Sequence, residues 1–397
     1  MSKLITDLMS QVQIDSTRRP IETALTLPSK AFTDNDFYQF EIEKIYKNNW
    51  IACIFDTQLT NPGDIFPFEM CEMPFLATRG QDLKIRVFHN VCPYDGSLIA
   101  IESSKGLEKI TVPYHGWEYK LDGKLLKTPY WDGTREGNLN ALEGKKVDLI
   151  EVNSNIFMNV IFINLSENPE NFKEYITPVI SSTHEYNLRN CKPGKNESGD
   201  VHISTSEVAT NWKTLCENAC LNVLHENFVH GIYNASPEVP RIKEDKTASY
   251  KSLIDGKFMA LSYDRQDFLK TYPIIDAPHL GKNEDIQPNM ETFGTLYPNF
   301  YFSASSQFIE VAIVLPHGPN KIEQNAIYQM NAELSDLAPV VNELANAFSG
   351  AFNEDARICE NLQKAKKSPV YQQKFYAPFW DSMHYKLTNL IMDDLEK

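Results

Sequence analysis

The sequence lacks the features that mark membrane-bound and secreted proteins. No segment of the 397-residue chain approaches the roughly 20 consecutive apolar residues that a membrane-spanning helix needs. The most apolar segment, residues 156–165, is interrupted by Asn159 and Asn164 and is predicted to be a strand. The first 20 residues have no apolar run, so we expect no secretory signal. The seven cysteines stand singly, which indicates no disulfide framework and favours a reducing, cytoplasmic compartment.

An excess of basic residues is also missing. The chain has 38 Lys and Arg against 53 Asp and Glu, which gives a formal net charge of −15. Because a nucleic-acid-binding protein has to neutralise phosphates with a basic surface, this balance argues against nucleic acid as a partner. The remaining composition, 42% hydrophobic and 23% charged, is that of an ordinary globular protein, and the length suggests two or three domains.

The pattern along the chain changes twice, and we interpret three regions. Residues 1–50 end in an amphipathic stretch, Asp34 to Trp50, whose apolar side chains recur near helical spacing, with Thr33 or Asp34 placed to cap the helix. Residues 51–165 hold short runs rich in Val, Ile, Phe and Tyr between turn signals such as Asn-Pro-Gly-Asp and Leu-Asp-Gly-Lys. Such regularly spaced short strands predict an all-β sandwich.

Residues 166–397 are predicted to form an α+β domain, because runs of strands are followed by long helical segments. Two segments, 205–232 and 334–366, are predicted to be helical. The polar, glycine-containing segment 189–200 is predicted to be a loop. The segments expected to be strands of an antiparallel sheet are 247–264, 292–302 and 307–331.

Two histidines five residues apart, His225 and His230, are candidate metal ligands. Neutral imidazole binds iron, zinc, copper and nickel, so the pair alone does not select a metal. Five residues rotate by roughly 140° on an ideal helix, so the two rings converge on one ion only where the helix ends or distorts between them. On spacing alone, two ordinary histidines are the commoner interpretation. His202, His279 and His384 match no motif and are expected to be structural.

Motifs around the histidines and near the C-terminus add a second signal. Residues 212–218 read Trp-Lys-x3-Glu-Asn before His-x4-His, and residues 354–363 read Glu-Asp-x4-Glu-x2-Gln. Together they resemble the catalytic domain of Rieske non-heme iron oxygenases, the aromatic-ring-hydroxylating dioxygenase alpha subunits. The resemblance implies a mononuclear Fe(II) site made by His225, His230 and Asp355. It also implies a helix-grip catalytic domain, with an antiparallel sheet and long helices, after a Rieske-like β sandwich.

This ligand set makes chemical sense. Two histidines and one carboxylate leave open positions on iron for dioxygen and substrate, as in other non-heme Fe(II) oxygenases. Two sheet segments, Leu-Tyr-Pro-Asn-Phe at 296–300 and Val-Leu-Pro-His-Gly-Pro-Asn at 314–320, also resemble the family. The competing interpretation is that Asp355 belongs to a solvated helix face, since Glu354 and Glu360 are its neighbours.

The sequence departs from the family at the Rieske cluster. A Rieske [2Fe–2S] centre needs two cysteines on one iron and two histidines on the other. The corresponding positions here are Cys92, Tyr94, Val112 and His115. Valine has no donor atom and tyrosine replaces imidazole poorly, so we expect no cluster. Because close packing disfavours holes, we expect Tyr94 and Val112 to fill the space.

Other uses of these positions are open but less favoured. His89 or Cys71 could supply a missing ligand, and Cys92 with His115 could hold a single metal ion. We favour the interpretation that Cys92 and His115 are packed side chains left from an ancestral site.

A second departure lies beside the iron motif. In the family, an aspartate three residues before the first iron histidine bridges that histidine to the cluster of the neighbouring subunit. Asn222 stands at this position, and an amide cannot carry the negative charge that orients a ligand histidine. Asn218 matches a family asparagine close to the iron. The altered bridge agrees with the altered cluster.

We therefore expect an Fe(II)-dependent oxygenase that uses O2 on a small organic substrate. Its electrons would come from the substrate, a redox partner or a cluster-bearing paralogue. The alternative is a catalytically silent subunit or ligand-binding module that partners an intact oxygenase; a zinc hydrolase is less favoured because no positioned general base is visible. The resemblance implies a homotrimer. Candidate pocket walls, each of which could equally be a core residue, are Leu221, Phe228, Phe293 and Phe352.

Overall fold

The computed structural model describes residues 4–137, 139–220, 225, 228–230, 250–264, 278–282 and 288–397. The chain divides into two compact units: unit 1 comprises Met1–Asn48 and Glu170–Lys397, and unit 2 comprises Asn49–Pro169. The N-terminal region that the sequence sets apart therefore groups with the C-terminal region. Across the described residues, no helix combines the length and the apolar character that crossing a membrane requires.

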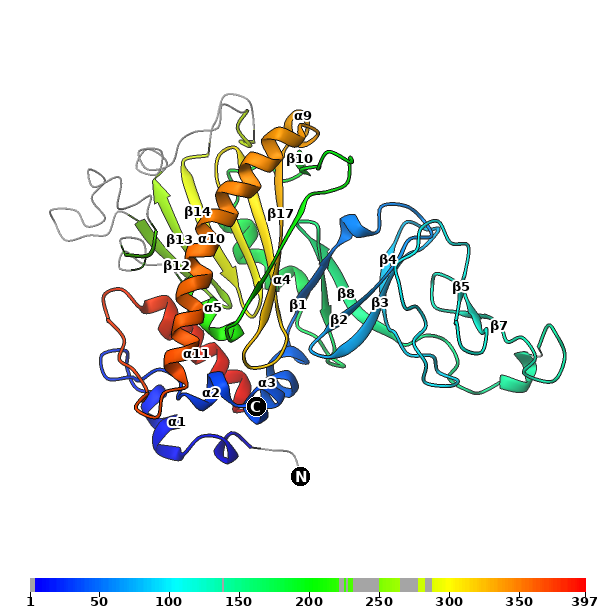
Figure 1. The fold of residues 1–397 in the computed structure, drawn as a ribbon, viewed down its shortest axis with the longest axis horizontal. Coiled ribbons are helices and arrows are strands. Elements are labelled where there is room, and N and C mark those ends of the chain that lie inside the picture. Colours follow the sequence, from blue (N-terminus) through cyan, green and yellow to red (C-terminus); the bar gives the residue numbers. More distant parts are fainter. Residues whose placement is uncertain are drawn as a thin grey trace. The chain divides into compact units, whose positions relative to one another are not determined.

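Unit 2 is built from antiparallel strands, as the run of short apolar segments predicts (Figure 1). The strands are β1 (Ile51–Phe55), β2 (Ile65–Met70), β3 (Met73–Arg79), β4 (Ile85–His89), β5 (Ile110–Thr111), β6 (Glu118–Tyr119), β7 (Leu125–Lys127), β8 (Glu151–Phe157) and β9 (Val160–Asn164). Six form a sheet in the order β1-β9-β8-β4-β3-β2, and three form a second sheet in the order β5-β6-β7. Two 3-10 helices, η3 (Asp56–Gln58) and η4 (Leu139–Leu142), lie between strands.

The predicted turn signals join these strands. Gly123, in the Leu-Asp-Gly-Lys signal between β6 and β7, has φ +83°. A Cβ atom there would lie 2.5 Å from the Phe88 ring, so both the backbone conformation and the packing require glycine.

Unit 1 combines helices with one large antiparallel sheet (Figure 1). Its helices are η1 (Ile5–Asp7), α1 (Gln11–Thr17), α2 (Lys30–Thr33), α3 (Asn35–Glu41), η2 (Ile42–Tyr46), α4 (Phe172–Ser182), α5 (Trp212–Ala219), α9 (Ala332–Ser335), α10 (Ala338–Lys366) and α11 (Ser382–Leu395). Its strands are β10 (Cys191–Pro193), β11 (Ile203–Val208), β12 (Tyr250–Asp255), β13 (Phe258–Asp264), β14 (Met290–Leu296), β15 (Phe300–Ala304), β16 (Phe308–Pro316) and β17 (Ile322–Asn331). The sheet has the order β10-β17-β16-β15-β14-β13-β12, and β11 also pairs with β17.

The helix expected from Asp34 is confirmed in its first part. The Asp34 carboxylate accepts a hydrogen bond from the backbone N–H of Phe37 at 3.1 Å and so caps α3. The helix then continues as the π-turn η2 through Tyr46.

Three sequence expectations were wrong in part. Residues 205–208, expected to begin a helix, belong to β11, because the Ser/Thr-rich alternation of this strand suits an extended conformation, and α5 begins only at Trp212. The expected loop 189–200 contains the short strand β10. The expected strand 156–165 is a hairpin, in which residues 158 and 159, both with positive φ, join β8 to β9.

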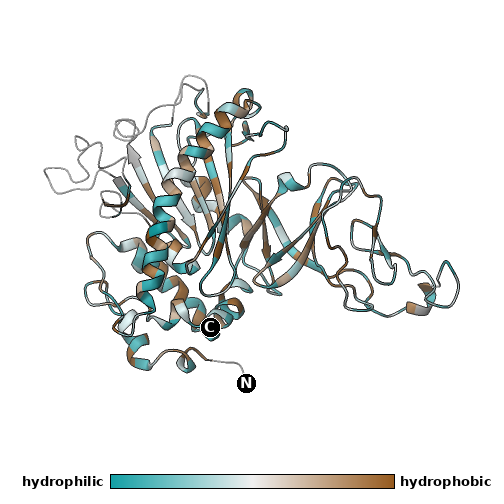
Figure 2. Ribbon diagram, viewed as in Figure 1, coloured by the Kyte–Doolittle hydropathy of each residue, from teal (hydrophilic) through white to brown (hydrophobic). Residues whose placement is uncertain are grey.

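The long helix α10 packs on one face of the large sheet. Tyr328 and Met330 of β17 form an apolar cluster with Val341 and Leu344 of α10, and Phe308 of β16 packs against it. Figure 2 shows hydrophobic stretches along the strands of this sheet and a mixture of hydrophobic and hydrophilic positions along α10, which is the pattern of a helix with one buried side. This packing defines the helix-facing side of the sheet.

Candidate metal centre

Three of the predicted side chains converge in unit 1. His225 Nε2 lies 3.2 Å from His230 Nε2 and 3.1 Å from Asp355 Oδ1. His230 Nε2 lies 3.6 Å from Asp355 Oδ1. The ligand atoms all lie within 4.8 Å of one another, and in the part of the chain that the structure describes this is the one group of His, Cys, Asp or Glu side chains that could hold a metal ion.

The convergence leaves one oxygen in need of a positive partner. The histidine side chains are only 12% and 10% exposed and that of Asp355 19%. Asp355 Oδ1 is buried and accepts no hydrogen bond. A buried carboxylate oxygen without a partner is costly, and a cation placed between this oxygen and the two Nε2 atoms would remove that cost. The residues present therefore fit a single metal ion.

The backbone explains how two histidines five residues apart can meet. The residues 225, 228 and 229 are helical, but His230 is not. The helix has thus ended at the second histidine, which is the condition that the spacing demands. Asp355 comes from α10, so the site joins a helix end to a long, continuous helix.

A fourth residue, Glu354, orients one of the ligands. Its Oε2 lies 3.0 Å from His230 Nδ1. A proton on Nδ1 would be held by this carboxylate, which leaves the lone pair of Nε2 facing His225 and Asp355. From the sequence, Glu354 is visible only as a member of a charged helix face. The signal that could have identified it is its place directly before a ligand.

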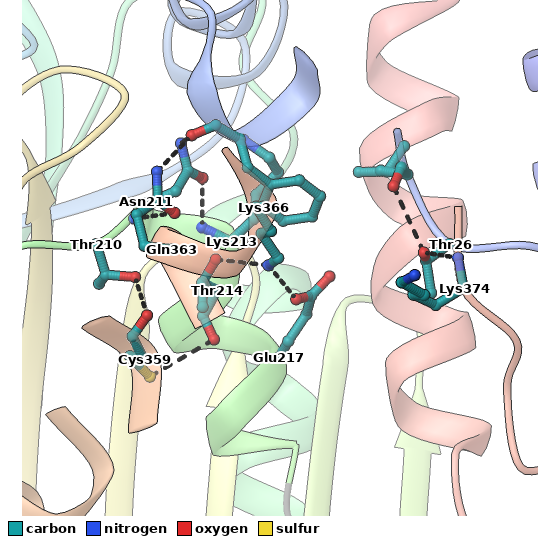
Figure 3. Close-up of polar contacts among 12 residues, drawn as sticks. Thr26, Thr210, Asn211, Lys213, Thr214, Glu217, Cys359, Gln363, Lys366 and Lys374 are labelled. Carbon is teal, nitrogen blue, oxygen red and sulfur yellow. Dashed lines mark hydrogen bonds and ion pairs between the residues drawn. The ribbon is translucent and has the colours of Figure 1, made fainter. Parts of the chain in front are cut away.

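Polar contacts hold α5 against α10 (Figure 3). The Thr210 hydroxyl donates to the carbonyl oxygen of Cys359 at 3.1 Å. Lys366 Nζ donates to the hydroxyl of Thr214 at 2.7 Å and to the carboxylate of Glu217 at 3.1 Å. These bonds fix the helix before the two histidines relative to the helix that carries the carboxylate.

The N-terminus of α5 is fixed in the core. Asn211 caps the helix, and its own N–H donates to Gln363 Oε1 at 3.2 Å. Lys213 Nζ lies 2.6 Å from Glu41 Oε1, and neither side chain is exposed. Trp212 Nε1 donates to the same carboxylate at 2.9 Å. The Trp-Lys part of the sequence motif therefore anchors the helix through a buried ion pair.

His384 also acts on this helix rather than on the metal centre. Its Nε2 donates to the carbonyl oxygen of Glu217 at 2.6 Å, and its Nδ1 lies 3.2 Å from Asp381. Burial lowers the pKa of His384, but the hydrogen bond to Asp381 and its charge outweigh burial and raise it. The structural role expected for this histidine agrees with these contacts.

The remaining predicted residues of this site are scattered. Asn218 is half-buried near the end of α5. Phe293 of β14 and Phe352 of α10 are half-buried, whereas Phe228 is 81% exposed and does not line an enclosed site. Two further predicted residues, Leu221 and Asn222, lie outside the described residues.

In unit 2, Cys92 and Val112 lie in the apolar core. They are 2% and 1% exposed and share one cluster with Trp117 and Tyr119. Cys92 Sγ lies 3.9 Å from the hydroxyl of Tyr119. The expectation that Val112 fills buried space is confirmed.

Tyr94 and His115 lie nearer the surface. The ring of Tyr94 stacks on Trp117, with centroids 4.8 Å apart and an interplanar angle of 7°, and meets the edge of Trp131 at 4.9 Å. Tyr94 remains 42% exposed, so the expectation that it fills a buried void was wrong: its ring lies over Trp117, which is itself buried. His115 Nδ1 lies 2.5 Å from Asp95 Oδ2.

These positions do not fit a [2Fe–2S] cluster. Of the four, one offers no donor atom and one is a phenol engaged in aromatic stacking. Burial raises the pKa of Asp95, but hydrogen bonds from Ser97 and His115 lower it to about 2, so this carboxylate is ionised beside the imidazole. His115 thus has a carboxylate partner, and the described residues of unit 2 contain no group of side chains suited to a metal.

Comparison with known proteins identifies the class. The profile described as "Ring hydroxylating alpha subunit (catalytic domain)" matches residues 188–389, more than half of the chain, and a "Rieske [2Fe-2S] domain" profile matches residues 49–140. The chain therefore belongs to the ring-hydroxylating oxygenase alpha-subunit family and is an O2-dependent oxidoreductase. The expected fold, a Rieske β domain followed by an α+β catalytic domain, is confirmed.

Individual relatives are distant. The chain is 24% identical over 395 residues to choline monooxygenase, chloroplastic, of Arabidopsis thaliana, covering 97% of this chain and 85% of that protein. It is 26% identical over 223 residues to the carnitine monooxygenase oxygenase subunit of Escherichia coli (strain K12), covering 55% and 56%. Among solved structures, a quaternary ammonium Rieske monooxygenase in complex with an inhibitor superposes with a TM-score of 0.74 at 19% identity, over 96% of this chain and 98% of that one.

Proposed function

We propose that this chain is an Fe(II)-dependent oxygenase that holds one iron through His225, His230 and Asp355 and carries no [2Fe–2S] cluster of its own. The observation that carries the proposal is a contrast in donor chemistry: three donors converge in unit 1, whereas in unit 2 Val112 offers no donor atom and Tyr94 is a phenol stacked on Trp117. Bound iron would activate dioxygen at its open coordination positions. The protein's part is to present two neutral imidazoles and one carboxylate on one side of the ion.

The side chains around the site support this part. Glu354 would hold a proton of His230 at Nδ1, so that the lone pair of Nε2 faces the position of the metal. The low exposure of both histidines limits competition from water. The contacts of Lys366 and Thr210 keep the distance between the ligand-bearing segments constant.

The electron supply follows from the balance of the reaction. Insertion of one oxygen atom of O2 into a C–H bond, with the other released as water, consumes two electrons and two protons. Without a cluster in the chain, we propose that these come from the substrate, an external redox partner or a cluster-bearing paralogue. One solved relative is described in terms of inter-subunit electron transfer. We also propose a homotrimer and a cytoplasmic location. The plant relatives differ in location, because their names describe them as chloroplastic.

The substrate is proposed to be a small organic molecule. The names of the relatives specify choline and carnitine, both of which carry a quaternary ammonium group. A small cationic compound is therefore the first substrate class to test for this chain.

The test should not depend on the electron source. Hydrogen peroxide is dioxygen already reduced by two electrons, so R–H plus H2O2 gives R–OH plus water without a further reductant. We expect Fe(II)-loaded protein to convert a substrate with peroxide, and His225→Ala protein to lose this conversion. Iron-loaded protein that converts nothing with peroxide, and oxidises substrate only after an intact oxygenase is added, would contradict the proposal and support a silent or ligand-binding subunit.

A further inference from the structure

A half-buried glutamate lies on the helix-facing side of the large sheet. Glu310 of β16 is directly opposite Ser303 of β15 and Tyr328 of β17. Alternate residues of a strand point to the same face, so Glu310 shares the face of Phe308. Because Phe308 and Tyr328 pack against α10, Glu310 points toward that helix as well.

Glu310 has no partner of its own within the residues that the structure describes. Its carboxylate makes no hydrogen bond or ion pair there, although the side chain is half-buried. Burial, together with the nearby charge of Asp355, raises the pKa of Glu310 to about 8. Glu41, a fully buried glutamate of unit 1, has both Lys213 and Trp212 as partners. An acid kept in such a place without a partner is costly for folding, which points to a ligand that supplies the missing positive charge.

Aromatic rings lie beside this carboxylate. The Phe308 and Phe348 rings are 5.1 Å apart in an edge-to-face arrangement, and the Tyr328 and Phe348 rings are 5.7 Å apart. Phe293 of β14 is opposite Ser303 and extends the same cross-strand row. Aromatic faces next to a carboxylate attract organic cations by both cation–π and ionic interactions.

The row lies within a small molecule's length of the metal centre. Phe348, Phe352 and Asp355 follow one another at intervals of four and three residues, so they share one side of α10. Seven residues of helix span about 10 Å. Glu310 is close enough to Asp355 to feel its charge, and its neighbours Phe308 and Tyr328 pack beside Phe348.

We propose that Glu310 recognises a positively charged nitrogen of the substrate, with Phe308, Tyr328 and Phe348 forming the aromatic side of the same subsite. The proposal rests on the proposed function, since it assigns to this residue the choice of substrate for the iron site. The cation takes the place of the missing partner, and its binding directs a carbon of the substrate toward Asp355. Neutral analogues of the same shape are excluded because they leave the carboxylate buried and unpaired.

Direct binding tests the proposal without turnover. The iron-loaded protein is titrated calorimetrically under nitrogen with choline, with tetramethylammonium, and with dimethylbutanol, the neutral analogue in which carbon replaces the nitrogen of choline. We expect at least one cation to bind about 30-fold more tightly than dimethylbutanol, and Glu310→Gln to remove this preference while leaving the neutral compound unchanged. The control is Glu207→Gln, an exposed glutamate at the other face of the sheet that pairs with Lys321, and it should leave all three affinities unchanged.

The outcomes separate recognition from chemistry and from metal binding. If neither cation binds, if dimethylbutanol binds as tightly, or if Glu310→Gln retains the preference, the proposal is overturned. A Glu310→Gln protein that keeps the affinities but loses turnover with every substrate would assign Glu310 to the reaction and also overturn it. Phe348→Leu provides a second variant, for which we expect weaker cation binding alone. Iron content is measured on each protein, so failure of the iron site itself would be seen separately as loss of iron from the wild type.

Discussion

Units 1 and 2 treat their metal-ligand positions in opposite ways. In unit 1, the donor atoms of His225, His230 and Asp355 face one another, and a buried oxygen is left for a cation to satisfy. In unit 2, Val112 closes the apolar core and Tyr94 stacks on its neighbours. This difference supports our proposal that unit 1 holds a metal ion, whereas the corresponding positions of unit 2 are packed without a cluster.

Removing one ligand from each unit is the strongest way to break this comparison. We expect His225→Ala to lose nearly all bound iron and to lower turnover by about a thousand-fold or more, because the remaining two donors cannot hold the ion. His115→Ala should keep the iron of the wild type. Iron is measured by atomic emission on purified protein. Equal iron loss in the two variants would show that unit 2 also holds iron and would contradict the difference proposed between the two units.

A second prediction compares a buried ion pair of unit 1, which anchors the helix before the metal ligands, with an exposed ion pair of the same unit. Lys213→Ala leaves Glu41 buried without its cation, so we expect unit 1 to lose about 3–5 kcal/mol of stability. The matched control is Lys47→Ala, which removes an exposed partner of Glu43 and should cost less than about 1 kcal/mol. Urea unfolding followed by tryptophan fluorescence measures both. A loss of equal size in the two variants would remove the role assigned to the buried pair.

The next largest effect, on metal affinity, is expected when the contact that orients His230 is removed. Glu354→Gln keeps the size of the side chain but removes the charge that holds the Nδ1 proton, so we expect metal affinity to fall about 10–100-fold. Glu343→Gln, on an exposed position of the same helix, is the control. Competition with a chelator of known affinity measures the metal dissociation constant of each protein. An unchanged affinity in Glu354→Gln would mean that the 3.0 Å contact does not orient the ligand.

The smallest effect is expected in unit 2. Val112→Ala removes two methyl groups from a residue that is 1% exposed, so we expect a loss of about 1–2 kcal/mol with no change in bound iron. Differential scanning calorimetry and metal analysis of the same sample check both statements. A neutral effect on stability would indicate that Val112 borders an open space rather than a packed core.

The convergence of His225, His230 and Asp355 could be predicted from the sequence because the three residues stand in motifs with fixed spacing. The sequence alone could not identify Glu354, because several acidic residues lie on the same helix and only the fold shows which of them contacts His230. Glu310 was missed for a related reason: Phe-x-Glu-x-Ala on a strand is the ordinary alternation of a sheet with one solvated face. Only the register of β16 against β17 and the position of α10 reveal that this glutamate points inward.

The strand β11 shows where secondary structure could not be predicted from the local sequence. Thr205 and Ser206 precede the helix cap at Asn211 and fall within the predicted helix 205–232, but pairing with β17 decides their conformation. Tyr94 shows where side-chain packing could not be predicted. The sequence shows that a tyrosine stands at a ligand position, but the location of its ring depends on contacts with Trp117 and Trp131.

The most direct test of the central claim is the amount of iron and of acid-labile sulfide per chain in protein purified without oxygen, together with its visible spectrum. We predict about one iron, no sulfide and no absorption of a Rieske centre. His225→Ala protein should then contain almost no iron. Additional iron with an equal amount of sulfide, retained in His225→Ala, would show that unit 2 holds a cluster and would contradict the account.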